Sequence, residues 1–148
     1  MTTDRFDSTA ADYARYRPHY PQAVYDTLAA AFALGGSGRL LDVSCGPGEV
    51  AIALHDRFDG VVGIDVSAEV IVEAQRQAEG SGVDAIEWRA MPAEEIGEAV
   101  GDFRLVVTSD ALHWMDPDGV LARCYQRVTP GGRIAHLTHG RSIVHCHG

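Results

Sequence analysis

Residues suited to binding a nucleoside stand at the ends of two apolar runs, RLLDVS and VVGID. Asp42 lies near the end of the first run, Gly46 and Gly48 form the turn that follows, and Asp65 closes the second run. Glycines let a backbone approach a ligand closely, and a helix that follows such a turn presents unpaired amides. A carboxylate 19 residues after Gly46 is placed to accept hydrogen bonds from two adjacent ribose hydroxyls. The spacing therefore predicts a site for an adenosine-containing ligand at the strand ends.

Two ligand classes fit this turn. Gly46, Gly48 and Ala51 satisfy the G-x-G-x-x-A pattern of dinucleotide sites, which indicates NAD and an oxidoreductase. Against NAD, Pro47 removes an amide from the turn that would hold a pyrophosphate. Asp42 would repel a diphosphate and attract an ammonium or a sulfonium group. The charges therefore favour S-adenosylmethionine over NAD, with NAD left as the weaker alternative.

Apolar runs of strand type alternate with stretches of helical periodicity along the chain. The expected strands are residues 39–44, 61–65, 85–89, 103–109 and 133–138. The expected helices are residues 21–34, 49–58, 118–128 and a stretch capped by Ser67, and TPGG at 129–132 is expected to be a turn. This rhythm predicts an α/β fold with a doubly wound, mostly parallel sheet. We divide the single domain into an N-terminal cap segment, 1–38, and a ligand-binding core, 39–148.

Composition narrows the class of protein further. The 148 residues correspond to about one domain. A formal charge of −9 argues against a nucleic-acid partner. Apolar runs fall far short of the ~18 residues of a bilayer span, and the polar N-terminus lacks a signal peptide core, so a cytoplasmic protein without a membrane partner is expected. Three cysteines without a CxxC predict reduced thiols and no disulfide, with Cys45 in a packing role.

Six short motifs occur in the order found in one enzyme family. They are YARYRPHYP, LLDVSCGPGEVA, VVGIDVS, MPAEEI, ALHWMDP and RVTPGGRIA, and together they cover about residues 10 to 138. The chain thereby resembles the class I S-adenosylmethionine-dependent methyltransferases, in particular a small-molecule branch similar to methyltransferase type 11. The resemblance implies a Rossmann-like sheet of strand order 3-2-1-4-5, S-adenosylmethionine as cofactor and methyl transfer to a small molecule.

The resemblance also implies roles for residues around the glycine turn. Gly46 and Gly48 would let the backbone approach the methionine and sugar portions, and Asp42 would orient the amino-acid end through water. Asp65 would hold both ribose hydroxyls. Ser44 stands where the family has the first glycine of the turn, so its side chain would crowd the cofactor.

Further contacts are implied by the other motifs. Val66 would pack on the adenine face, and the Ala93 amide and Glu94 would meet the adenine edge. Ser109 and Asp110 would lie beneath the methionine portion. The resemblance also implies that the N-terminal cap closes over the cofactor through Tyr13, Tyr16 and Arg17.

Candidates for acid–base and metal chemistry are few. His113 in ALHWM is the candidate general base, with a hydrogen-bonded histidine behind the sheet as the alternative. Trp114 is interpreted as core or pocket wall, and His19 and Tyr20 are weaker candidates for acceptor contacts. No metal site is predicted, because no recognised spacing joins the donors His136, His139, His145, Cys146 and His147.

The chain departs from the family pattern at two places. Arg104 replaces a common aspartate at the start of the fourth strand, which we interpret as a local change in solvation. The sequence stops about ten residues after the fifth strand, where the family continues. We therefore expect the fifth strand to be an exposed edge that forms a homodimer or leaves a weakly active monomer. A non-catalytic S-adenosylmethionine-binding module stays open as the alternative function.

Overall fold

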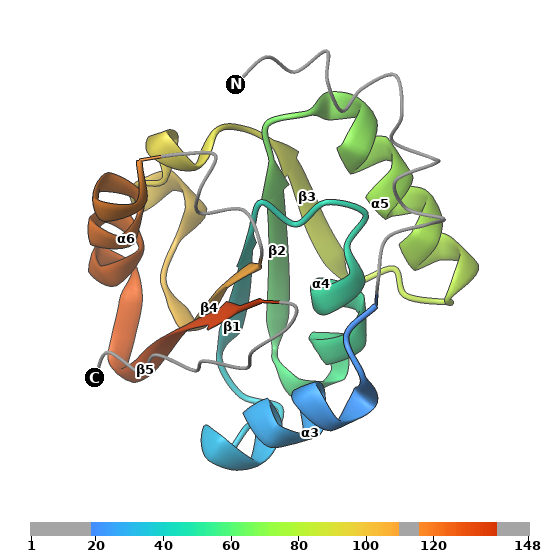
Figure 1. Cartoon of the computed structure of the whole chain (residues 1–148), viewed down its shortest axis with the longest axis horizontal. Coiled ribbons are helices and arrows are strands. Elements are labelled where there is room, and N and C mark those ends of the chain that lie inside the picture. The colour runs from blue at the N-terminus through green and yellow to red at the C-terminus, as the bar shows by residue number, and fades with distance from the viewer. Residues whose placement is uncertain (1–18, 110–115, 139–148) are drawn as a thin grey trace.

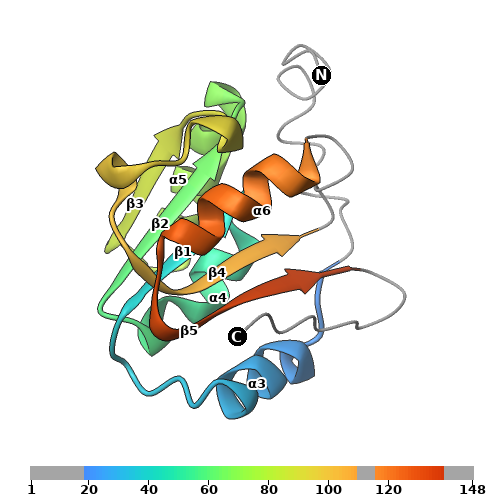
Figure 2. The ribbon, with the colours of Figure 1, turned by 90° about the vertical axis from the view of Figure 1, so that its left-hand side faces the viewer.

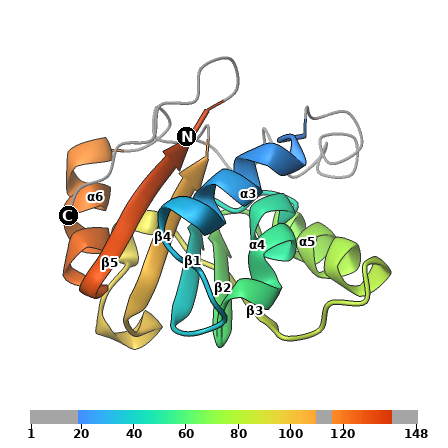
Figure 3. The same ribbon diagram turned by 90° about the horizontal axis from the view of Figure 1, so that it is seen from below.

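A five-stranded sheet forms the centre of the protein. The computed structural model describes residues 19–109 and 116–138. All strand pairs are parallel, in the order β3-β2-β1-β4-β5, as Figures 1 and 3 show. The strands are β1 Arg39–Val43, β2 Gly60–Asp65, β3 Ile86–Ala90, β4 Phe103–Ser109 and β5 Val128–Leu137. The predicted α/β fold and the strand order 3-2-1-4-5 are confirmed.

Helices connect the strands as the sequence predicts. The α-helices are α3 Gln22–Ala31, α4 Glu49–Leu54, α5 Ala68–Gly80 and α6 Pro117–Gln126, and the 3-10 helices are η1 His55–Arg57, η2 Ala93–Glu95 and η3 Glu98–Val100. The Ser67 hydroxyl accepts a hydrogen bond of 3.2 Å from the amide of Val70, so the predicted N-cap of α5 is confirmed. In the described part of the chain, no helix is long and apolar enough to cross a membrane.

Side chains of the sheet are buried on both faces. In β1, Leu40 points to the layer of α3, α4 and α5, whereas Leu41 and Val43 point to the layer of α6, η2 and η3. Figure 2 shows β5 between α6 on one side and α3 on the other. Because both faces of the central strands β1, β2 and β4 are covered, their middle positions are buried and mostly apolar, which explains the apolar runs in the sequence.

The segment TPGG is part of β5 and not a separate turn. Val128 pairs with Phe103, but Arg133, five positions later, pairs with Leu105, only two positions later on β4. The extra residues of β5 form a bulge, in which Gly131 takes a left-handed φ of 81°. The predicted turn at 129–132 and the predicted helix end at residue 128 are therefore wrong, since α6 ends at Gln126.

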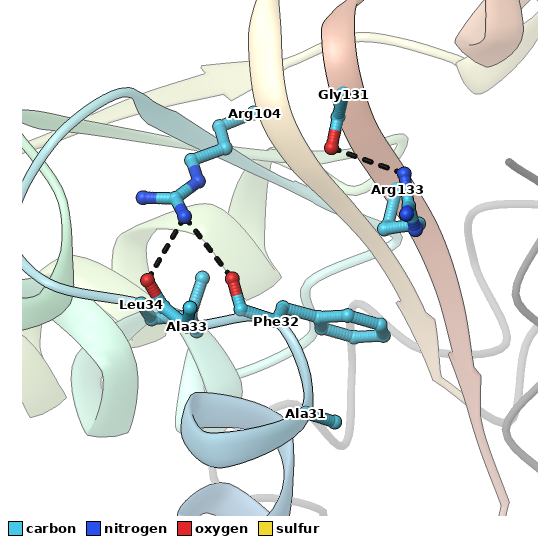
Figure 4. A pocket seen from close by; sticks show the side chains of 7 residues that line it. All are labelled: Ala31, Phe32, Ala33, Leu34, Arg104, Gly131 and Arg133. Atoms are coloured by element: carbon cyan, nitrogen blue, oxygen red, sulfur yellow. Dashed lines mark hydrogen bonds between the residues drawn. The ribbon is translucent and has the colours of Figure 1, made fainter.

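Arg104 caps the end of α3. Its Nη2 donates to the carbonyls of Phe32 at 3.0 Å and Ala33 at 2.9 Å (Figure 4). Its Nη1 donates to the carbonyl of Ser37 at 3.3 Å. The last carbonyls of a helix lack partners within the helix and carry partial negative charge, so a guanidinium group stabilises them. Our interpretation of Arg104 as a change in solvation is therefore wrong, because the side chain links β4 to α3.

A cavity of about 160 Å³ lies beside this link. Its lining residues are Ala31, Phe32, Ala33, Leu34, Arg104, Gly131 and Arg133 (Figure 4). It lies at the start of β4, at the opposite end of the parallel sheet from the glycine turn. It is therefore separate from the site that the sequence predicts.

Candidate functional site

The Asp65 carboxylate joins the glycine turn to the start of α5. Its Oδ2 accepts a hydrogen bond from the amide of Gly46 at 3.0 Å, and its Oδ1 accepts one from the amide of Ser67 at 3.0 Å. Gly46 and Gly48 take left-handed φ values of 54° and 86°, and Gly48 is the N-cap of α4. The carboxylate is therefore held in one orientation at the carboxyl end of β2.

The residues assigned to the adenine lie next to Asp65. The amide of Met91 donates to the carbonyl of Asp65 at 2.8 Å, which brings the segment after β3 to the end of β2. This segment continues directly into η2, which begins with Ala93 and Glu94. Val66 is 36% exposed, a large value for an apolar side chain at a strand end. The structure thus brings together Asp65, Val66 and the predicted adenine loop.

Asp42 has a structural contact in addition to its predicted role. The side chain is fully buried, and Oδ2 accepts a hydrogen bond of 3.2 Å from the amide of Ala51 in the first turn of α4. This bond satisfies one of the amides that a helix start leaves without a partner. Asp42 therefore fixes α4 against β1, directly behind the glycine turn.

Gly48 faces an aromatic ring. A Cβ on Gly48 would lie 2.5 Å from Cη2 of Trp88, and a Cβ on Gly63 would lie 2.6 Å from Cζ3 of the same ring. Gly63 and Trp88 are partners in the register of β2 and β3. The indole ring of Trp88 thus packs against Gly48 in the glycine turn. This ring and the left-handed φ of Gly48 are two structural reasons for glycine at this position, beside the predicted close approach of the cofactor.

Glu49 is a residue of the site that the sequence analysis missed. Its Oε1 accepts hydrogen bonds from the amide of Tyr20 at 2.7 Å and the hydroxyl of Tyr25 at 3.2 Å, and lies 3.5 Å from Nδ1 of His19. The Tyr20 hydroxyl donates to the carbonyl of Leu137 at 3.3 Å. Glu49 thus attaches residues 19–20 to the helix that follows the glycine turn. A carboxylate at the first position of a helix was the available signal.

The ends of β4 and β5 carry further polar side chains. Ser109 is the last residue of β4 and is buried, and its place beneath the methionine portion stays a prediction. Thr108 lies 2.7 Å from His136, measured between Oγ1 and Nδ1, a pair that the sequence analysis also missed. Among the residues that the structure describes, no three side chains of His, Cys, Asp or Glu gather closely enough to hold a metal ion.

Several predicted residues lie outside the described ranges. They are Tyr13, Tyr16, Arg17, Asp110, His113, Trp114, His139, His145, Cys146 and His147. Their assigned roles stay predictions.

The two described cysteines are buried and reduced. Burial raises the pKa of the Cys124 thiol to about 12, so the reactive thiolate is scarce near neutral pH. In a Cys146→Ser variant we expect no rapid reaction with a thiol reagent at pH 8, and reaction of both remaining thiols in denaturant. With a thiol reagent that releases a chromophore, absorbance measures the number of reacted thiols in the folded and in the denatured protein. Rapid labelling of one thiol in the folded protein would contradict the burial of these cysteines.

Ser44 takes a left-handed φ of 55° that L side chains rarely adopt. We expect Ser44→Gly to bind S-adenosylhomocysteine as tightly as wild type or more tightly. We also expect the free energy of unfolding to rise by no more than about 1 kcal/mol. Relief of backbone strain raises this free energy, whereas the greater entropy of the unfolded chain lowers it. Calorimetry and denaturant unfolding measure these values. Ser81→Gly, at a φ of −95°, is the control in which only the entropic loss acts. A large loss of affinity would mean that the hydroxyl contacts the ligand.

Comparison with known proteins defines the class of this fold and site. Residues 40–132 match the sequence profile of a family described as "Methyltransferase domain". The chain belongs to this methyltransferase family, which confirms the resemblance to class I S-adenosylmethionine-dependent methyltransferases. The cofactor of the family is S-adenosylmethionine, as predicted.

Individual relatives agree with this assignment. A ubiquinone biosynthesis O-methyltransferase of Pseudomonas entomophila is 36% identical over 106 residues, which cover 70% of this chain and 45% of the relative. The chain thus spans less than half the length of this curated relative. An S-adenosylmethionine-dependent methyltransferase from Clostridium acetobutylicum has a TM-score of 0.72 at 16% identity, over 90% of this chain and 56% of that one.

A third similar protein was solved with the methyl donor. It is the magnesium protoporphyrin IX methyltransferase of Synechocystis PCC 6803 with bound S-adenosylmethionine, with a TM-score of 0.71 at 20% identity over 97% of this chain and 77% of that one. At such identities, the two solved structures establish the fold.

Proposed function

We propose that this chain binds S-adenosylmethionine at the carboxyl ends of β1, β2 and β4 and transfers the methyl group to a small-molecule acceptor. The observation that carries the proposal is the Asp65 carboxylate, whose two oxygens are oriented by amides of Gly46 and Ser67. A carboxylate has two oxygens that together accept up to about four hydrogen bonds, which suits it to the two adjacent hydroxyls of a ribose. The family membership supports the same donor.

The surrounding residues suit a donor without phosphate groups. Val66 offers apolar surface beside Asp65 for a base to pack against. Asp42 is a buried carboxylate behind the turn, and a negative charge in a medium of low dielectric constant attracts a cation and repels a pyrophosphate. Pro47 lacks the amide that a pyrophosphate would need. This set of groups favours an adenosyl sulfonium over a dinucleotide.

The residues of the chain would act mainly by binding and orientation. When bound, S-adenosylmethionine supplies an electrophilic methyl group. Ser109 would support the methionine portion from the end of β4, and Tyr13, Tyr16 and Arg17 would exclude water from above. His113 is our predicted general base. Because the P. entomophila relative is named an O-methyltransferase, we propose a hydroxyl oxygen as the acceptor atom.

Calorimetric titration with S-adenosylhomocysteine tests the donor site. We expect saturable binding that NADH does not compete away, whereas displacement by NADH would favour the oxidoreductase alternative. A second assay follows transfer of a labelled methyl group to a panel of phenols, carboxylates and amines. Transfer to a phenol supports the proposal. Binding of S-adenosylhomocysteine without transfer to any acceptor would favour the non-catalytic binding module.

Three predictions stay open beside this proposal. They are the cytoplasmic location, the division into residues 1–38 and 39–148, and the homodimer through β5. β5 is the outer strand of the described sheet. Light scattering of the purified chain measures the oligomeric state.

A further inference from the structure

The cavity beside the end of α3 carries two positive charges and no negative one. Its charged lining residues are Arg104 and Arg133, and no lining residue is acidic. Among the described residues, both guanidinium groups bond only to main-chain carbonyls and a serine hydroxyl, and neither forms an ion pair. Arg89 differs, because it pairs with the carboxylate of Glu87 at 3.0 Å. A cleft lined by charges of one sign concentrates ions of the other sign, so this cavity favours an anion.

The bulge of β5 orients the guanidinium group of Arg133. Its Nη1 donates to the carbonyls of Gly131 and Gly132, each at 3.0 Å. Among the described residues, Nε and Nη2 have no hydrogen-bond partner. These two nitrogens share one edge of the planar group, and their N–H bonds match the two oxygens of a carboxylate. Arg133 therefore presents a pair of donors, held in direction by the bulge, that suits a carboxylate.

The part of the cavity wall at the end of α3 is apolar. Phe32, the C-cap of α3, is half-buried, and Leu34 is buried. Figure 4 shows both at the end of α3, whereas the two arginines come from β4 and β5. The cavity volume is about 160 Å³, and a cavity of about 150 Å³ can hold a benzene ring. A ligand with one ring and one anionic group therefore fits the size and the chemistry of this cavity.

We propose that this cavity is a second ligand site, which binds a small aromatic carboxylate. Nε and Nη2 of Arg133 donate to its two oxygens, Arg104 adds a second positive charge, and the ring packs on Phe32. The site lies at the opposite end of the parallel sheet from the glycine turn, so it does not depend on the proposed methyl transfer. A ligand there joins α3 to β5 and stabilises the folded chain, because it binds the folded state alone.

Titration of the full chain with benzoate tests this site. In nitrogen-15-labelled protein, the Nε–H resonance of Arg133 is assigned by its absence in Arg133→Gln. We expect benzoate to shift this resonance saturably, with a dissociation constant on the order of 1 mM for so small a ligand. Benzyl alcohol lacks the charge and acetate lacks the ring, so each should bind at least about tenfold more weakly. Inorganic phosphate that binds as tightly as benzoate would overturn the assignment to an aromatic carboxylate.

Variants of the arginine separate a specific site from general attraction to charge. Arg133→Gln should lower the affinity for benzoate about 10- to 100-fold, because a charge-assisted pair of hydrogen bonds is lost. Arg89→Gln removes the same charge on β3, the other edge strand of the described sheet, and should bind benzoate as wild type does. Arg133→Lys keeps the charge but loses the paired donors, so it should bind more weakly than wild type. Circular dichroism checks the fold of each variant.

Three results would overturn the second site. The first is a wild-type protein whose Arg133 resonance does not shift with benzoate, a measurement that needs no variant to fold and bind. The second is a folded Arg133→Gln or Arg133→Lys protein with the affinity of wild type. The third is competition between benzoate and S-adenosylhomocysteine, which would place benzoate at the glycine turn. Loss of S-adenosylhomocysteine binding in the wild-type chain would instead refute the proposed function, and it would leave the benzoate titration unchanged.

Discussion

Replacement of Asp65 with alanine is expected to lower the affinity for S-adenosylhomocysteine by about 30- to 1,000-fold. The variant loses two charge-assisted hydrogen bonds to the ribose, worth on the order of 2 to 4 kcal/mol. It also releases the amides of Gly46 and Ser67 that the carboxylate now holds at 3.0 Å. Isothermal titration calorimetry measures the change, since each 1.4 kcal/mol corresponds to about tenfold in affinity.

Two further variants make this result specific. Asp84→Ala removes an exposed carboxylate of the same type in the loop before β3 and should leave the affinity unchanged. Asp65→Asn keeps one side-chain oxygen toward the amides. It is the second variant to test if Asp65→Ala does not fold. Circular dichroism checks the fold of each protein. An Asp65→Ala protein that is folded and binds as tightly as wild type would remove the main support for the proposed site.

Gly48→Ala is expected to lower the free energy of unfolding by about 2 to 5 kcal/mol. A left-handed φ of 86° costs an L residue about 1–2 kcal/mol. The new Cβ would also lie 2.5 Å from Cη2 of Trp88, and such overpacking costs about 1–3 kcal/mol. Denaturant unfolding measures the loss of stability.

The chain offers a separate control for each of the two costs. Gly36 has a φ of 95° with no atom within 4 Å of a built Cβ, so Gly36→Ala measures the cost of φ alone. Gly63 has no left-handed φ but faces Trp88 at 2.6 Å, so Gly63→Ala measures the overlap alone. Trp88→Phe should recover part of the loss in Gly63→Ala. A Gly48→Ala protein as stable as wild type would contradict the packing of the indole against the turn.

The order of helices and strands could be predicted from the sequence because strand ends and helix caps are marked by neighbouring residues. The end of β2 at Asp65 and the cap at Ser67 could be read from neighbouring residues, and the structure confirms both. The end of α6 was less predictable, because residues 127–132 carry turn-forming residues that the structure uses in a bulge of β5. Such a bulge depends on pairing with β4, which a single sequence does not specify.

The missed parts of the candidate site are contacts between distant residues. Glu49 bonds to Tyr20, 29 residues earlier, and the side chains of Thr108 and His136 are 28 residues apart. The support of the glycine turn by Trp88 requires the register of β2 and β3. Asp65 was found because a known spacing relates it to the turn, and no such spacing relates the others.

The attachment of α3 at both ends has a consequence for how the chain unfolds. Near its start, Tyr25 bonds to Glu49, and past its end the carbonyls of Phe32 and Ala33 accept bonds from Arg104. A helix that is held at one end only can fray independently of the domain, at little cost in free energy. Because the two attachments lead to α4 and β4, α3 cannot detach without breaking contacts with both. Its backbone amides therefore belong to the same cooperative unit as the sheet, and hydrogen exchange from α3 should require opening of that unit.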